Sequence, residues 1–318
     1  MIRIRFFLLV VVAAAVSGNG QQPTGRTYSS SAPVRRLPPA AQYPSPVTFA
    51  DVTRESSITF KHEASPTSQK YLLETMGGGV ALFDFDNDGR MDLYFTNGAR
   101  LEDPMRENAR AEKDDPRYWN RLFHQKKDGA FEDVTARAGI MGRGYSMGVA
   151  AGDYDNDGWI DLYVTEYGAN ILYRNLGDGS FADVTRQAGV EGGGWSASAG
   201  WFDADRDGRL DLLVARYLDW NFARGAMHCG EKRAGYRAYC HPDSFPGITS
   251  LLFYQQPNGT FKEAGGRARI VDAERKALGV AFADFNDDGW TDIIVANDSV
   301  RQALYVNQKN GTFEEIAT

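Results

Sequence analysis

The amino-acid sequence predicts an all-β fold, a β-propeller built from four-stranded antiparallel blades. The first observation is an acidic nine-residue phrase that occurs four times: DFDNDGRMD (84–92), DYDNDGWID (153–161), DADRDGRLD (203–211) and DFNDDGWTD (284–292). The second is a phrase that recurs after each copy, for example LYRNLGDGSFADVT (172–185). Repetition of such a multi-strand unit is the sequence signature of a propeller.

Each unit is expected to contain four short strands. A small-residue stretch leads into the acidic phrase, as in GVAAGD (148–153), and an apolar stretch leaves it, as in DLYVTE (161–166). An Asp-Gly or Asn-Gly turn, a strong hairpin signal, joins the third strand to the fourth. We expect the blade units at about 77–140, 146–190, 196–270 and 277–318. Inner strands converge where side chains have little room, which suits the small residues found five positions before each acidic phrase: Gly79, Gly148, Ser198 and Gly279.

Irregular segments surround these units. Insertions at 99–119, expected to be a helical surface excursion, and at 217–250 lengthen the first and third units. The segment VTFADVTRESSI (47–58) matches a fourth strand without the first three, so it is interpreted as a strand that closes the ring with the last blade. The chain stops at GTFEEIAT, where its sister phrases continue. We therefore expect an incomplete, about four-bladed part of a larger propeller, with a closed four-bladed ring as the alternative.

The N-terminus predicts secretion. Arg3 and Arg5 precede an apolar run, FFLLVVVAAAV (6–16), and small residues follow it, which is typical of a signal peptide over 1–18. The run is short for a membrane span, so a cleaved signal is preferred to an uncleaved anchor. Residues 19–46 are rich in Pro, Ser and Gln and predict a linker. The mature chain is expected to be secreted, extracellular or periplasmic, without a membrane span.

The acidic phrase predicts a calcium loop of the form D-x-D-x-D-G-x-x-D. Carboxylates this close repel one another unless a cation neutralises them. Gly at position 6 permits a tight turn, and hard oxygen ligands favour Ca²⁺. The predicted ligands are side chains at positions 1, 3, 5 and 9 and the carbonyl at position 7: Asp84, Asp86, Asp88, Arg90 and Asp92; Asp153, Asp155, Asp157, Trp159 and Asp161; Asp203, Asp205, Asp207, Arg209 and Asp211; and Asp284, Asn286, Asp288, Trp290 and Asp292.

About four Ca²⁺ ions with a structural role are therefore expected. A single acidic phrase could be a polar hairpin turn, but four copies between the same two strands favour metal binding. Asn286 lacks a charge, so the fourth site is expected to be the weakest. The formal charge of −7 and the lack of a basic cluster argue against a nucleic-acid partner.

The cysteines, histidines and aromatic residues are further candidates for functional sites, and they indicate a function less clearly than the acidic loops do. Cys229 and Cys240 are the only cysteines, and in a secreted chain they predict a disulfide. A Cys₂His₂ metal site with His228 and His241 is the alternative, although it lacks the usual short ligand spacing. His62 and His124 are interpreted as structural. Aromatic residues around the third unit predict packing, or alternatively a surface that stacks on carbohydrate: Trp195, Trp201, Tyr217 and Trp220.

The residues KYLLETMGGGVALFDFDNDGRMDLYFTNG (70–98) and the Tyr-Cys-His-Pro run at 239–242 resemble the cartilage acidic protein and ASPIC/UnbV family. Its repeats are similar to the FG-GAP or VCBS-type repeats of integrin alpha-chain propellers. The resemblance covers residues 47–318. It implies a secreted, roughly seven-bladed, calcium-binding propeller. It also implies a C-terminal ASPIC/UnbV domain, which this sequence does not contain, and no assigned catalytic reaction.

We therefore expect a scaffold for cell adhesion or ligand binding, with an extracellular protein or glycan as its partner. No catalytic constellation is found in the sequence. The alternative is a calcium-dependent propeller enzyme such as a polysaccharide lyase, which would need a base and a charge neutraliser converging in a cleft.

Overall fold

The computed structural model describes residues 49–106, 109–233, 235–271 and 274–317. The predicted signal peptide and the linker lie outside these residues. The chain divides into two compact units, Met1–Ala50 and Asp51–Thr318. The helices and strands found in the described residues all belong to the second unit.

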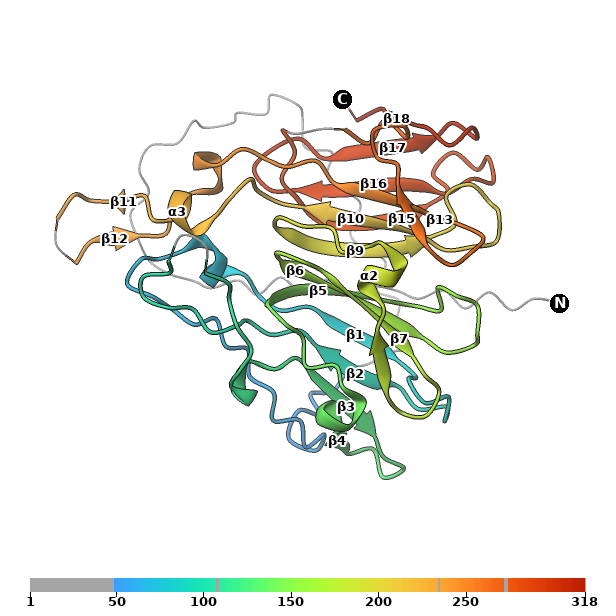
Figure 1. Cartoon of the computed structure of the whole chain (residues 1–318), viewed down its shortest axis with the longest axis horizontal. Coiled ribbons are helices and arrows are strands. Elements are labelled where there is room, and N and C mark those ends of the chain that lie inside the picture. The colour runs from blue at the N-terminus through green and yellow to red at the C-terminus, as the bar shows by residue number, and fades with distance from the viewer. Residues whose placement is uncertain (1–48, 107–108, 234, 272–273, 318) are drawn as a thin grey trace, which may run out of the picture. The chain divides into compact units, whose positions relative to one another are not determined.

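Four antiparallel sheets of four strands each make up the second unit, and Figure 1 shows them following one another in chain order. The first contains β1 (Val80–Phe83), β2 (Asp92–Phe95), β3 (Arg121–Gln125) and β4 (Phe131–Asp133). The second contains β5 (Tyr145–Gly152), β6 (Asp161–Tyr167), β7 (Ile171–Asn175) and β8 (Phe181–Asp183). The third contains β9 (Ser196–Phe202), β10 (Asp211–Arg216), β13 (Leu251–Gln255) and β14 (Phe261–Glu263). The fourth contains β15 (Ala277–Ala283), β16 (Asp292–Asn297), β17 (Ala303–Asn307) and β18 (Phe313–Glu315).

Helical residues are few in the described part of the chain, and the predicted all-β fold with four strands per unit is confirmed. The helices are α1 (Thr135–Ala138), α2 (Thr185–Ala188) and α3 (Phe222–Gly225), with 3₁₀ turns η1 (Leu72–Thr75), η2 (Pro116–Tyr118) and η3 (Pro242–Ser244). A small hairpin consists of β11 (Cys229–Gly230) and β12 (Arg237–Ala238). None of the helices in the described residues is long and apolar enough to cross a membrane.

The third and fourth strands of each sheet meet at the predicted Asp-Gly or Asn-Gly turn. In the second sheet, Asp178 Oδ1 accepts the backbone N–H of Ser180 at 3.0 Å, and Gly179 has a φ of +85°. Asn310 accepts the N–H of Thr312 in the same way in the fourth sheet. The side chain closes the turn and glycine adopts the positive φ without steric strain, so the local sequence sets the hairpin.

Small residues let the innermost strands approach one another. Strand β1 contacts β5, β5 contacts β9, and β9 contacts β15. A Cβ atom on Gly79 would lie 2.9 Å from the Cα of Gly148, and one on Gly148 would lie 2.7 Å from the carbonyl oxygen of Ala197. Larger side chains at Gly79 and Gly148 would force the sheets apart. At Gly279 the nearest atom would be 3.7 Å away, an ordinary contact, so packing does not require glycine there.

Separate apolar cores lie between consecutive sheets. Between the first and second sheets, Tyr94 and Leu122 pack with Leu162 and Ile171. Further cores join the second sheet to the third and the third sheet to the fourth. Exit strands such as β6 are buried on both faces, which explains why their sequences lack polar alternation.

The outer faces of the first and fourth sheets are open to solvent. Val80 and Leu82 in β1 are 52% and 55% exposed, whereas the alternating Ala81 and Phe83 are buried. Leu278 in β15 and Phe285 in the loop after β15 are also exposed. A closed four-bladed ring would cover both faces, so the described residues form an open series of sheets rather than that ring.

The two insertions share one aromatic core. Leu101, Met105 and Ala111 of the first insertion belong to the same buried cluster as Trp220 and Phe222 of the second. The predicted helical surface excursion at 99–119 is therefore wrong. Its described residues contain no α-helix, only the 3₁₀ turn η2 and a bridge between Arg100 and Glu112, and its apolar side chains pack inward. Buried Lys113 holds this segment in place, because its ammonium group donates hydrogen bonds to the carbonyl oxygens of Asn97, Gly98 and Tyr118.

The aromatic residues around the third sheet pack against one another. The Trp195 ring lies 5.2 Å from that of Tyr217 and 5.3 Å from that of Trp220, and all three are buried. Trp201 packs elsewhere, 6.0 Å from the ring of Tyr154. The packing interpretation is confirmed, because the three buried rings have no free face for a carbohydrate.

Residues 51–58 adopt the turn that follows a fourth strand elsewhere in the chain. Ser57 has a φ of +61°, as Gly139 does at +77° after α1. The carbonyl oxygen of Ser56 accepts the N–H of Phe131 at 2.9 Å, as that of Ala268 accepts the N–H of Phe313 at 2.9 Å. The described part of this segment therefore contacts the first sheet as the end of a preceding unit would.

Candidate metal centres in the four acidic loops

Each acidic loop joins the first and second strands of one sheet, as the sequence predicts. Loop one (84–92) follows β1, loop two (153–161) follows β5, loop three (203–211) follows β9 and loop four (284–292) follows β15. In loop two the turn places Asn156 at a φ of +56° and Gly158 at +90°. The corresponding residues of the other three loops have the same signs, so all four loops fold alike.

The carboxylate at position 1 shapes the loop by accepting backbone hydrogen bonds. In loop two, Asp153 accepts the N–H groups of Asp157 at 3.0 Å and Gly158 at 2.9 Å. Asp157 at position 5 accepts the N–H of Trp159 at 3.0 Å. These bonds wrap the backbone around the carboxylates, and they recur in the other loops.

The aspartate at position 9 is buried and ties the loop to the sheet. Asp161 Oδ2 accepts the N–H of Tyr154 at 3.1 Å, and its Oδ1 accepts the N–H of Asn175 at 2.8 Å. Asp92, Asp211 and Asp292 make the corresponding pair of bonds. This residue therefore links positions 2 and 9 of the loop with the end of the third strand.

Three loops bring carboxylate oxygens within 4.8 Å of one another, in the groups Asp84–Asp86–Asp88, Asp153–Asp155–Asp161 and Asp203–Asp205–Asp211. In loop one, His124 also joins Asp86 and Asp92.

Cationic side chains partly neutralise these groups. Arg174 Nε lies 2.7 Å from Asp155, and its Nη2 lies 3.0 Å from Asp157. Lys309 lies 3.3 Å from Asp288, and Arg90 and Arg209 pair with Asp88 and Asp207.

The residues fit a hard divalent cation. Asp86 Oδ1 and Asp155 Oδ1, both at position 3, are buried and have no hydrogen-bond partner in the described residues. A buried carboxylate oxygen without a donor is destabilising, and a coordinated cation would satisfy it. The donors in loops two and three are oxygen atoms, the ligands that Ca²⁺ prefers.

Comparison with known proteins identifies these repeats. The family model described as FG-GAP-like repeat matches residues 108–164, 153–214 and 284–318, which include loops two, three and four. The chain carries FG-GAP-like repeats. The predicted resemblance to cartilage acidic proteins is also confirmed.

Cartilage acidic protein 1 of Mus musculus is 37% identical over 68 residues, covering 21% of this chain and 10% of that protein. The Homo sapiens protein is 32% identical over 83 residues, covering 25% and 12%. The Xenopus tropicalis protein is 26% identical over 268 residues, covering 79% and 36%. The chain thus spans about a third or less of the length of the curated relatives that it matches.

Among solved structures, an Agrocybe aegerita lectin that recognises non-reducing terminal N-acetylglucosamine is similar at a TM-score of 0.38 and 14% identity. The match covers 76% of this chain and 51% of the lectin. A likeness at that TM-score assigns neither a fold nor a ligand to the FG-GAP-like repeats.

Burial changes the acidity of several carboxyls in the acidic loops. It raises the pKa of Asp161 to about 7, and nearby Asp155 and Asp157 oppose ionisation further, although backbone N–H groups favour it. The pKa of Asp211 is raised to about 7 for the same reasons. Burial also raises the pKa of Asp92, Asp155 and Asp205. Asp161 and Asp211 are therefore partly protonated near neutral pH.

A pH dependence follows from these shifts. Between the ordinary pKa of 3.8 and about 7, the folded chain holds protons on Asp161 and Asp211 that the unfolded chain releases. These two groups therefore lower the free energy of unfolding as pH rises through that window. Ca²⁺ binds the ionised carboxylates, so we expect it to raise the melting temperature more at pH 8 than at pH 5.5. Melting curves with CaCl₂ and with EDTA at both pH values test this, and an equal or smaller increment at pH 8 would contradict it.

Loop four differs from the other acidic loops. Phe285 at position 2 is 43% exposed, whereas Phe85 in loop one is 1% exposed. Asn286 Nδ2 donates to Asp288 at 3.0 Å, so the amide takes a place that a carboxylate holds elsewhere. Greater access of water and the missing charge both weaken cation binding, which supports the prediction that this site is the weakest.

His124 is a site residue that sequence reasoning missed. Its Nδ1 lies 3.1 Å from Asp92 Oδ1 and 3.5 Å from Asp86 Oδ2. An alignment of the four units could have indicated this residue, because His124 occupies the position at which the other third strands have Arg174, Tyr254 and Val306. Loop one therefore offers a nitrogen donor beside its carboxylates, which the other three loops do not.

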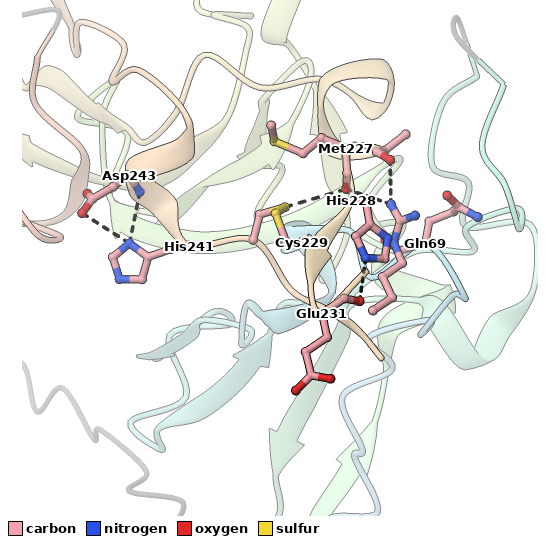
Figure 2. The surroundings of a disulfide bond; sticks show 10 residues. Gln69, Met227, His228, Cys229, Glu231, His241 and Asp243 are labelled. Atoms are coloured by element: carbon pink, nitrogen blue, oxygen red, sulfur yellow. Dashed lines mark hydrogen bonds and ion pairs between the residues drawn. A yellow bond between two sulfur atoms is a disulfide. The ribbon is translucent and has the colours of Figure 1, made fainter. Parts of the chain in front are cut away.

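The predicted disulfide joins Cys229 and Cys240, with an S–S distance of 2.05 Å. The Cys₂His₂ alternative is wrong, because the sulfurs are bonded and the two histidines turn to different partners, as Figure 2 shows. His228 Nε2 lies 3.0 Å from the carbonyl oxygen of Glu231, and His241 Nδ1 lies 3.4 Å from Asp243. The bond closes the hairpin of β11 and β12.

Removal of this disulfide should destabilise the second insertion. The bond joins residues 11 positions apart, and closing a loop of that length contributes about 3 kcal/mol in the chain-entropy model. We expect the double variant Cys229→Ser/Cys240→Ser to lower the free energy of unfolding by about 2–3 kcal/mol. Thiol titration of the denatured wild type should find no free thiol before reduction and two after it. Free thiols before reduction would contradict the pairing.

Proposed function

We propose that these FG-GAP-like repeats form part of a calcium-binding β-propeller in an extracellular protein, where they act as a scaffold for adhesion or ligand binding. One observation carries the proposal: the same carboxylate loop lies between the same two strands of all four sheets. A catalytic site is usually built once, whereas this arrangement recurs in every unit. Repetition supports a structural ion in each blade.

The role proposed for Ca²⁺ is to stabilise each blade. The loop carboxylates crowd together, and position 9 buries its carboxyl group against the sheet. A bound ion would neutralise the repulsion and complete the coordination of the position 3 oxygens. The proposed ligands are the side chains at positions 1, 3, 5 and 9 with the carbonyl at position 7, and His124 would add to site one.

The blades are proposed to belong to a larger, roughly seven-bladed propeller. Consecutive sheets contact through their inner strands, as blades do around a central axis. Residues 51–58 contact the first sheet as the end of a preceding unit would, although none of the described residues 49–58 lies in a strand. The open faces of the first and fourth sheets leave room for neighbouring blades.

An extracellular or periplasmic location is proposed for the mature chain. The signal pattern at 1–18 and a disulfide closing a surface hairpin are both typical of exported proteins. Expression with the native N-terminus tests this: the expected product is an exported chain that begins near residue 19. An intact N-terminus in the cytosolic fraction would contradict it.

Direct binding tests the calcium proposal. Isothermal titration of EDTA-treated, dialysed protein with CaCl₂ should find about four ions per chain, with one site weaker than the others. The variant Asp155→Asn/Asp157→Asn should remove one ion from the stoichiometry. Binding of no calcium at millimolar concentration would refute the proposal, since extracellular calcium modules bind at about 10⁻⁴–10⁻³ M.

A glycan array and a panel of extracellular matrix proteins, each probed with and without Ca²⁺, test the scaffold role. The expected result is binding without turnover. Release of unsaturated oligosaccharides from pectin-like polymers would instead support the polysaccharide-lyase alternative.

A further inference from the structure

We infer that a buried carboxamide at the end of the third strand of the second, third and fourth sheets couples neighbouring acidic loops, so that their cations bind cooperatively. The residues concerned are Asn175, Gln255 and Asn307. The inference rests on the proposed calcium function and adds its regulation: the loops act as a linked series rather than as independent sites.

The carboxamides reach from one sheet to the loop of the preceding one. Asn175 Nδ2 donates to the carbonyl oxygen of Phe85, in loop one, at 2.8 Å. Gln255 Nε2 donates to that of Tyr154, in loop two, at 2.7 Å. A third bond of the same kind, at 2.8 Å, runs from Asn307 Nδ2 to Ala204 in loop three. All three acceptors occupy position 2 of their loops, and all three carboxamide side chains are buried.

Backbone hydrogen bonds extend each of these contacts into both loops. The N–H of Asn175 donates to Asp161 in its own sheet at 2.8 Å, and the N–H of Phe85 donates to Asp92 at 3.0 Å. A continuous path therefore runs from Asp161 through Asn175 and Phe85 to Asp92. We call such a path a relay. Equivalent relays join Asp211 to Asp161 through Gln255 and Tyr154, and Asp292 to Asp211 through Asn307 and Ala204.

The relays connect proposed ligands, because every path begins and ends at a position 9 aspartate. A cation at one loop would fix the orientation of that carboxylate and of the peptide groups bonded to it. In a buried, low-dielectric path, hydrogen bonds polarise one another. Ordering by the first cation would also lower the entropic cost of ordering the next loop, which gives positive cooperativity. By linkage, the coupling acts equally in both directions.

The chain contains a matched control at the same position of the first sheet. The N–H of Gln125 donates to Asp92 at 2.8 Å, as the relay residues do in their own sheets. In the described part of the chain, its side-chain amide makes no bond to another loop. Gln125→Ala therefore removes a carboxamide from the same structural position without breaking a relay.

A competing path between loops one and two runs over the surface. Asn87 Nδ2 donates to the carbonyl oxygen of Gly158 at 3.0 Å, and both residues are exposed. Water competes for this bond, so we expect it to carry less coupling than the buried relay. Asn87→Ala distinguishes the two paths.

Terbium luminescence can test the relay at site two. Tb³⁺ is the probe, and Trp159 in loop two sensitises its emission; all variants carry Trp290→Phe to remove the corresponding signal from loop four. In otherwise wild-type protein, Asp86→Asn at site one should weaken Tb³⁺ binding at site two about tenfold, within the usual range for coupled sites. In Asn175→Ala, the same Asp86→Asn change should alter site two less than twofold. With Gln125→Ala or Asn87→Ala, the tenfold effect should persist.

Each outcome decides one of the proposals. If neither Tb³⁺ nor Ca²⁺ binds, the calcium function fails. If the ions bind but the Asp86→Asn effect is unchanged in Asn175→Ala, or disappears only in Asn87→Ala, the relay is wrong. Should Asn175→Ala not fold, Gln255→Met removes the next carboxamide with little change in volume. It should abolish the effect of Asp205→Asn at site three on site two, and a persisting effect would overturn the inference.

Discussion

Chelation of divalent cations should lower the melting temperature of this chain by about 10–20 °C. At a Ca²⁺ concentration about ten times the dissociation constant, each site stabilises the folded state by roughly 1.4 kcal/mol. Four sites would together contribute about 6 kcal/mol, and each kcal/mol shifts the melting temperature of a domain this size by about 2–4 °C. The physical reason is the repulsion among loop carboxylates, which only the folded chain holds together.

Differential scanning calorimetry in CaCl₂, MgCl₂ and EDTA measures this effect. Magnesium should restore little of the lost stability, because it dehydrates reluctantly and demands octahedral geometry. The triple variant Asp155→Asn/Asp157→Asn/Asp161→Asn should reduce the calcium-dependent increment by at least a quarter, because it removes one of four sites. The same melting curve in EDTA and in CaCl₂ would show that the loops do not need an ion.

Asp161→Ala should be the most damaging single substitution in an acidic loop. The side chain is fully buried and accepts hydrogen bonds from the N–H groups of Tyr154 and Asn175. Its removal leaves two buried donors without partners, each destabilising by about 1–3 kcal/mol. We therefore expect a loss of about 2–6 kcal/mol in the free energy of unfolding in EDTA, before any effect on calcium.

Asp157→Ala is the matched control for this substitution. Asp157 lies in the same loop but is exposed, and it bonds only at the surface, to Trp159 and Arg174. In EDTA it should cost less than about 1 kcal/mol, since exposed ion pairs contribute little. Both variants should weaken calcium binding at site two. Urea unfolding with and without Ca²⁺ separates the effects, and equal losses for the two variants in EDTA would contradict the structural role of position 9.

Local patterns predicted much of this fold because they encode local geometry. Asp178-Gly179 and Asn310-Gly311 close hairpins through their own side chains and through glycine at positive φ, so the turns could be read directly. The prediction failed at 99–119. The charged residues there suggested an exposed helix, but Leu101, Met105 and Ala111 pack into an aromatic core supplied by distant segments. The sequence pattern of the insertion by itself does not show which distant residues form the core that it packs into.

In the candidate sites, too, some features follow from the local sequence and others depend on the tertiary structure. The repeated phrase by itself determined the loop residues, their position between two strands and the kind of ligand they suit, because spacing and donor type act within nine residues. Only the tertiary structure decided that His124 joins site one, that Phe85 is covered whereas Phe285 is exposed, and that Asn175 reaches a loop 90 residues away. Those features depend on which sheets become neighbours, and neighbourhood is set by long-range packing that no short stretch of sequence encodes.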